Sequence, residues 1–186
     1  MKVNIKVRDN YKSYCSLIDE EKTLLNNKIV LDEKKNSRAD YKEKNTPAYS
    51  DVLPNDIILT IQQKETEEKD FKFILFCKSF CEKPFFRYDS VGPAHRNANL
   101  PIPIEKQQVP TPHFHRYVGD GKEIAYKTKP LQDPGSSKAL EDIDLCIHHF
   151  FQESHIKADN FILISSPGVL PFVTEDNDPL EDINFK

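Results

Sequence analysis

The sequence predicts an α+β fold, in which an antiparallel β-sheet carries helices packed on one of its faces. Short runs rich in β-branched and aromatic residues recur through the middle of the chain, at residues 56–63, 71–80 and 85–89. One long amphipathic helix is expected in the C-terminal half, from Ser136 or Ser137 to about Ser154. Strands that cluster in one region and a helix that follows them are typical of α+β domains.

The N-terminal half contains several weaker patterns. Alternation over residues 3–7 predicts a short strand, and a partial apolar stripe over residues 11–31 favours a helix. Residues 32–54 are dominated by Lys, Asn and Glu and include Pro47 and Pro54, so we expect a loop or a mobile insertion. The apolar runs 56–63 and 71–80 flank a charged turn, which predicts a hairpin, and residues 85–89 form a third strand.

The C-terminal half begins with a segment rich in proline. Four prolines within residues 94–112 predict an extended, ordered loop. Residues 113–117 and 123–128 are expected to form a hairpin around Gly119 and Gly121, and residues 161–164 another strand. A chain of 186 residues without an internal repeat predicts a single domain, here residues 1–174, followed by an acidic tail over residues 175–186.

Charge is distributed unevenly along the chain. The formal net charge is −4, but residues 84–131 carry seven basic and four acidic side chains, whereas residues 132–186 carry three and eleven. The sequence pI of about 5.9 argues against a protein that coats nucleic acid. A small basic cleft that binds a phosphodiester remains compatible with this composition.

The four cysteines lack zinc-finger spacing, which favours reduced, buried thiols. No signal peptide is evident, and no apolar run reaches membrane-spanning length. We therefore expect a cytoplasmic protein without membrane association. The abundance of Lys over Arg is typical of coding by an AT-rich bacterial or phage genome.

The candidate catalytic residues are His95, His113 and His115. In a strand, residues i and i+2 point to the same face, so His113 and His115 are expected side by side. Paired imidazoles suit general acid–base cleavage of a phosphodiester, with Arg or Lys stabilising the developing charge. They equally suit metal ligation, with His95 and Asp89 completing the set, or a structural role.

The residues around these histidines supply candidates for substrate binding. Arg grips phosphate well, and an aromatic ring can stack on a base. The candidates are Arg87, Tyr88, Asp89, Arg96, Asn97, Arg116 and Lys127. We expect no cofactor, and no metal is assigned.

The order of these motifs resembles that of a known family. Arg87-Tyr88-Asp89, then Pro93-Ala94-His95, then residues 112–115 (PHFH) and an amphipathic helix look like the TumE-type toxins of bacterial toxin–antitoxin modules. The segments GPAHRN (residues 92–97) and PTPHFH (residues 110–115) also resemble those of a related bacterial family. The likeness covers about residues 85–155, and Arg96 stands where the toxins have a second histidine.

The resemblance implies that Arg87, Asp89, His95, His113 and His115 line a cleft, that RNA is the target and that an antitoxin is the partner. The expected function is therefore a toxin-like endoribonuclease using His acid–base chemistry. The alternative is a non-enzymatic inhibitor from a phage or mobile element, whose acidic C-terminal third docks on a host defence protein or a nucleic-acid-binding protein. A metal-dependent hydrolase is the third hypothesis.

Overall fold

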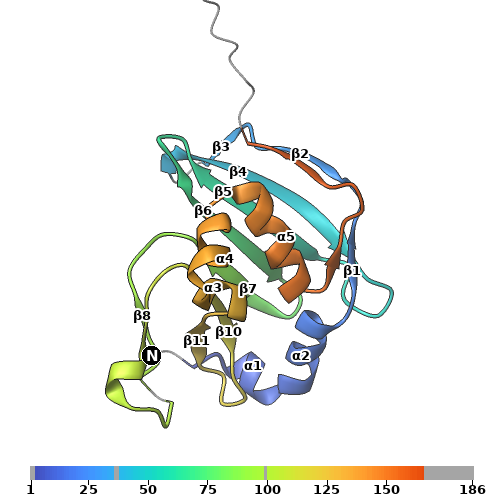
Figure 1. Cartoon of the computed structure of the whole chain (residues 1–186). Coiled ribbons are helices and arrows are strands. Elements are labelled where there is room, and N and C mark those ends of the chain that lie inside the picture. The colour runs from blue at the N-terminus through green and yellow to red at the C-terminus, as the bar shows by residue number, and fades with distance from the viewer. Residues whose placement is uncertain (1–2, 36–37, 99, 166–186) are drawn as a thin grey trace, which may run out of the picture.

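The computed structural model describes residues 3–35, 38–98 and 100–165, and it confirms a mixed α+β fold with a large, mainly antiparallel sheet. Nine strands form this sheet, and Figure 1 shows it running across the molecule. The strands, in order across the sheet, are β11 (Glu123–Tyr126), β10 (His113–Tyr117), β7 (Cys81–Asp89), β6 (Glu67–Cys77), β5 (Ile57–Lys64), β4 (Arg38–Tyr49), β1 (Lys22–Leu24) and β12 (Ile156–Lys157), with β3 (Glu33–Lys35) paired to β4.

Two small ribbons accompany the large sheet. β2 (Lys28–Val30) pairs in parallel with β13 (Ile162–Ile164), and β8 (His95–Arg96) pairs antiparallel with β9 (Gln108–Val109). The edge pair β1 and β12 is also parallel. These parallel pairs join an early segment of the chain to a late one.

Helices cover one face of the sheet (Figure 1). The helices are α1 (Ile5–Asp9), α2 (Tyr11–Asp19), α3 (Lys129–Gln132), α4 (Pro134–Ala139) and α5 (Ile143–Glu153), with a short 3-10 turn at Ile104–Lys106. Phe150 of α5 packs against Phe73, Phe86 and Phe114 of three neighbouring strands, with ring centroids 5.3–6.2 Å apart. This aromatic cluster is the centre of the core.

Strand alternation decides what the opposite face carries. In β7, Phe86 and Tyr88 point toward the helices, so Arg87 and Asp89 point away from them. In β10, Phe114 points toward the helices, so His113 and His115 share the other face, as the sequence spacing predicts. The polar residues of the central strands therefore gather on the face that α5 does not cover.

Two of the expected secondary-structure elements are wrong. The long helix from Ser136 or Ser137 to Ser154 is divided into α4 and α5, because α4 ends at Ala139 and Asp142 caps a new helix by accepting from the amides of Asp144 and Leu145. The cap of α4 is Asp133. The short strand expected over residues 3–7 is also wrong, because Ile5–Asp9 form the helix α1.

The prediction of a loop over residues 32–54 is also wrong, because residues 38–49 form the long strand β4. This strand pairs with β5 over eight residue pairs, from Tyr41↔Lys64 to Ala48↔Ile57. Its buried positions include Tyr41, Thr46 and Ala48, which the surrounding charges mask in the sequence. Pro47 is tolerated because it lies between the stretch that pairs with β3 and the stretch that pairs with β1. The acidic tail at 175–186 and the boundary at residue 174 lie outside the described residues.

Candidate functional site

A row of polar side chains crosses four adjacent strands of the exposed face. The strand registers pair Gln62 with Lys72, Lys72 with Asp89, and Asp89 with His113. Side chains directly opposite each other in neighbouring strands lie about 5 Å apart, so the register alone brings these four groups together. The next row places Arg87 opposite His115.

The third histidine comes from a different part of the chain. His95 lies in β8, within a flap formed by residues 91–98 and 100–112 that folds beside β11. Asn97 fastens this flap to the sheet, because its side chain donates to the carbonyl of Ala125 (2.8 Å) and accepts from the amide of the same residue (2.9 Å). A proline-rich loop thus becomes one wall of a site whose floor is the sheet.

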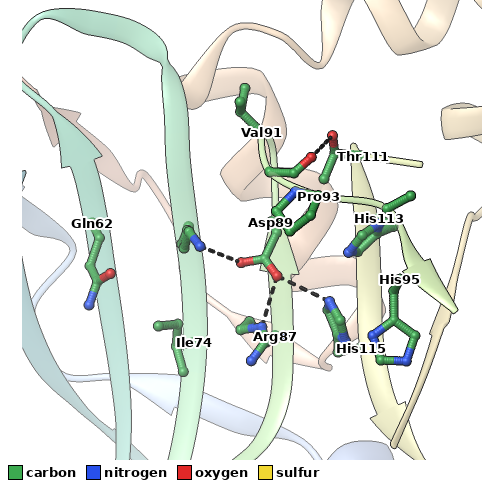
Figure 2. A pocket seen from close by; sticks show the side chains of 13 residues that line it. Gln62, Ile74, Arg87, Asp89, Val91, Pro93, His95, Thr111, His113 and His115 are labelled. Carbon is green, nitrogen blue, oxygen red and sulfur yellow. Dashed lines mark hydrogen bonds and ion pairs between the residues drawn. The ribbon is translucent and has the colours of Figure 1, made fainter. Parts of the chain in front are cut away.

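Asp89 is the centre of the charged contacts (Figure 2). Its carboxylate lies 2.9 Å from Arg87 Nε, 3.1 Å from His115 Nε2 and 3.3 Å from Lys72 Nζ. Burial by itself raises the pKa of a carboxyl group, but His115, Arg87 and Lys72 hold the pKa of Asp89 well below its usual range. Asp89 is therefore ionised at neutral pH.

The three imidazoles lie edge to face. The ring centroid of His115 is 4.6 Å from that of His113 and 4.9 Å from that of His95. Burial, and then the neighbouring His115, lower the pKa of His113 to about 4, and burial also lowers the pKa of His95. His113 is consequently neutral at pH 7, with a ring nitrogen that can accept a proton or a metal ion.

Several polar atoms of this cluster are buried without a hydrogen-bond partner. They are His95 Nε2, His113 Nδ1, both ring nitrogens of His115 and Asp89 Oδ1. Three of these five atoms still face an oppositely charged group at 3.1–3.6 Å, so His95 Nε2 and His113 Nδ1 are the two with neither kind of contact. Native proteins rarely leave buried polar atoms unsatisfied. Together with a cavity of about 440 Å³ whose lining includes all three histidines, Arg87, Asp89 and Lys72, they point to a site built for a ligand.

Other predicted site residues lie elsewhere. Tyr88 is fully buried in the core between Phe71, Phe73 and Phe114, so it cannot stack on a base. Arg116 points to the opposite face, where its guanidinium lies 4.9 Å from the centre of the Tyr126 ring.

The remaining three candidates surround the cluster rather than form it. Asn97 holds the flap in place through its two hydrogen bonds to Ala125. Arg96 is exposed next to His95, and Lys127 follows β11; neither residue lines the cavity.

Three residues of the site escaped the sequence analysis. Lys72 and Gln62 enter through the pairing of β5, β6 and β7, and Glu123 lies with Oε1 3.6 Å from His115 Nδ1 and 3.8 Å from Arg87 Nη1. A sequence signal existed for Lys72, which is a lone charge in the apolar run 71–77. Gln62 and Glu123 carried no comparable signal.

The other histidines and the cysteines are away from this site. His149 packs on Phe114 from the helix side, and His148 is exposed on α5. All four cysteines are free, and Cys77, Cys81 and Cys146 are buried. Within the described ranges, no helix combines the length and apolar character needed to cross a membrane.

No protein-family model, curated protein or solved structure matches this chain. The geometry of the site therefore carries the functional argument.

Proposed function

We propose that the protein is a toxin-like endoribonuclease that cleaves RNA in the histidine pocket. One observation carries the proposal: three imidazoles from two separate chain segments converge in one cavity beside Arg87 and Lys72. Histidines supply proton transfer, and the two cations suit a phosphodiester. The choice of RNA is supported by the motif resemblance to the TumE-type toxins.

The two sheet histidines differ in their surroundings, which assigns their roles. His113 is neutral at pH 7 and can accept the proton of a ribose 2′-hydroxyl. His115 lies between two carboxylates, Asp89 and Glu123, and we assign it the role of proton donor.

The proposed reaction is a transesterification. The 2′-oxygen attacks the phosphorus as His113 takes its proton, the bond to the 5′-oxygen breaks, and protonated His115 gives its proton to that leaving oxygen. The products are a 2′,3′-cyclic phosphate and a 5′-hydroxyl end. Arg87 and Lys72 stabilise the charge on the phosphoryl oxygens in the transition state.

The test is cleavage of total RNA by purified wild type and by His113→Ala and His115→Ala variants. The matched control is His148→Ala, which removes an exposed histidine far from the pocket. We expect each pocket variant to lose at least about 100-fold in cleavage rate with an unchanged circular dichroism spectrum, and the control to cleave like wild type. Retained cleavage in both pocket variants would refute the proposal.

The alternative of an acidic inhibitor depends on the acids at 175–182, which lie outside the described residues. Intact RNA after incubation with folded wild type would shift the assignment to this alternative. The next experiment would then be a pull-down with the tail acids neutralised.

A further inference from the structure

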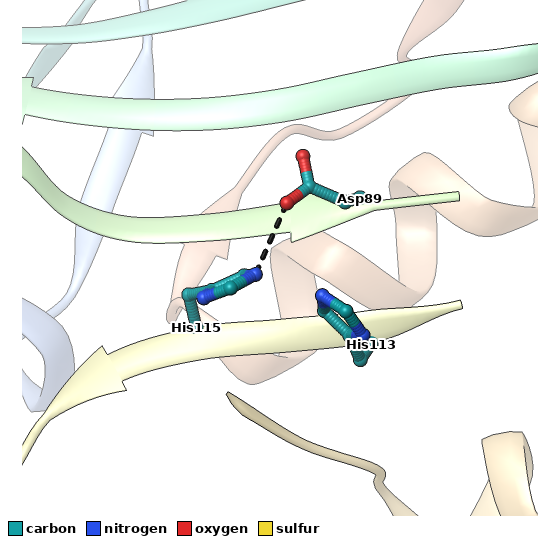
Figure 3. A group of neighbouring side chains, drawn as sticks. All are labelled: Asp89, His113 and His115. Atoms are coloured by element: carbon teal, nitrogen blue, oxygen red, sulfur yellow. Dashed lines mark ion pairs between the residues drawn. The ribbon is translucent and has the colours of Figure 1, made fainter. Parts of the chain in front are cut away.

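We infer that Asp89, His113 and His115 bind a divalent transition-metal ion, zinc in particular, and that the bound ion inhibits the pocket. Figure 3 shows the three side chains on β7 and β10, facing the same space. The metal-binding part stands independently of catalysis. The inhibitory part rests on the proposed function.

The donor atoms meet the requirements of such a site. One ligand atom from each of the three residues lies within 4.8 Å of the others. Tetrahedral zinc separates its ligand atoms by about 3.4 Å, and His115 Nε2 already lies 3.1 Å from Asp89 Oδ2. Coordination would require the His113 side chain to rotate toward the other two ligand atoms, which lie within 4.8 Å of its ring nitrogen.

Burial distinguishes this cluster from a surface group of acids. Asp89, His113 and His115 are only 7%, 2% and 3% exposed, and His113 Nδ1 is buried without a hydrogen-bond partner. A bound ion would satisfy His113 Nδ1 and would be coordinated by the Asp89 and His115 atoms that otherwise pair with each other. Two imidazoles and a carboxylate are ligands that zinc prefers.

His95 is placed to be a fourth ligand. Its ring centroid lies 4.9 Å from that of His115, and its Nε2 is buried without a partner. His95 is carried by the flap, near whose start Gly92 has φ +151°, a backbone conformation that favours glycine. A small flap movement would close His95 onto the ion, and a water molecule would otherwise take the fourth position.

The positive charges of Lys72 and Arg87 oppose the binding of a cation at Asp89. The surroundings of each residue reduce this repulsion. Lys72 Nζ lies 3.3 Å from Asp89 Oδ1, and the Lys72 side chain is 28% exposed, so it can swing away toward solvent. Arg87 is also shared with Glu123, which offsets part of its charge. Removing the Lys72 charge should therefore strengthen metal binding.

Inhibition follows from the chemistry of the imidazole lone pair. A ring nitrogen that coordinates a metal ion cannot accept or donate the proton that phosphodiester cleavage requires. The same residues thus bind either the metal ion or the substrate in a reactive state. Cleavage would depend on the free zinc concentration.

The experiment titrates Co²⁺ into the chelator-treated full chain and follows visible absorption, with Zn²⁺ then added to displace the cobalt. We expect one ion per chain in wild type, no saturable binding in His113→Ala and His115→Ala, and wild-type binding in His148→Ala. Lys72→Met should bind at least about threefold more tightly. Absence of binding by wild type, or unchanged binding in His113→Ala, would overturn the site.

The inhibitory part has its own readout. Zinc at one equivalent should stop RNA cleavage by wild type, and chelation should restore it. Cleavage that continues with one zinc bound would overturn inhibition and leave the metal site standing. Cobalt binding by a protein that never cleaves RNA would instead remove the proposed function alone.

Discussion

The hydroxyl of Tyr14 bridges β10 and β7 beyond the point where their backbone pairing ends. It accepts a hydrogen bond from the amide of Tyr117 at 2.7 Å. It also donates to the carbonyl of Phe85 at 3.0 Å. The pairing of β7 with β10 ends at Arg87↔His115, and continuing the same register would bring Phe85 opposite Tyr117 two positions further on. A helix side chain thus joins α2 to the two strands that carry the pocket.

Replacing Tyr14 by Phe should destabilise the fold without altering the pocket. The substitution leaves a buried amide and a buried carbonyl unpaired, which costs about 1–3 kcal/mol for each group. The measurement is the free energy of unfolding in urea. Tyr11→Phe, on the exposed neighbouring ring, should change it by less than about 0.5 kcal/mol. Equal stabilities for Tyr14→Phe and wild type would contradict the bridging role.

Replacing Asp89 by Asn should abolish activity while retaining the fold. The substitution keeps the shape of the side chain but removes the charge that orients Arg87, Lys72 and His115. We expect a loss of at least about 100-fold in kcat/KM for a short RNA. Glu141→Gln, which breaks the exposed ion pair with Lys69, is the matched control and should leave kcat/KM unchanged.

Replacing Asn97 by Ala should loosen the flap that carries His95. Both hydrogen bonds to Ala125 are lost, so amide hydrogen exchange should accelerate in residues 91–98 and 100–112. Exchange in β6 and β7 should stay as in wild type. Asn27→Ala, which removes an exposed bond to the Asp159 carbonyl, is the control. Unchanged exchange in the flap would show that other contacts hold it.

His149 should make stability depend on pH. Burial lowers the pKa of His149, although Glu153 and Gln152 act in the opposite direction, and its Nε2 lies 2.9 Å from Thr128 Oγ1. The unfolded chain therefore takes up the proton more readily than the folded protein. Stability is retained above the ordinary His pKa of 6.5 and falls as the pH drops below it.

The corresponding measurement is the urea midpoint from pH 7.5 to 5 in wild type and in His149→Gln. The variant cannot titrate, so its midpoint should fall less over this interval. His148→Gln, on the exposed side of the same helix, should keep the wild-type slope. Identical slopes for His149→Gln and wild type would show that the imidazole titrates alike in both states.

The sequence predicted the parts of the site that depend on local alternation. His113 and His115 share a face because they are two residues apart in a strand, and a hairpin around Gly121 sets that strand beside β11. Lys72 could not be predicted as a partner of Asp89, since the register between β6 and β7 depends on a shift near Cys77 that no local pattern reveals. Strand register is a property of the assembled sheet.

The errors in the fold have similar causes. Residues 38–49 are highly charged, yet they form a strand because β5 offers a complete ladder of backbone partners and the apolar positions face inward. Tertiary pairing there outweighs local composition. The prediction of one long helix is wrong for the opposite reason, because a local interaction outweighs the overall pattern. Asp142 caps a new helix within a segment whose apolar stripe looks continuous.

The parallel pairs at the edge have a consequence for synthesis. β1 pairs with β12 and β2 with β13. Lys22 and Lys28 therefore cannot form these pairs until Ile156 and Ile162 have been synthesised. All strands of the pocket lie between Ile57 and Tyr126 and are joined to near neighbours, so they are available earlier. On the ribosome, the pocket can form while one border of the sheet is still open. That interval is when the nascent chain is most exposed to edge-to-edge association.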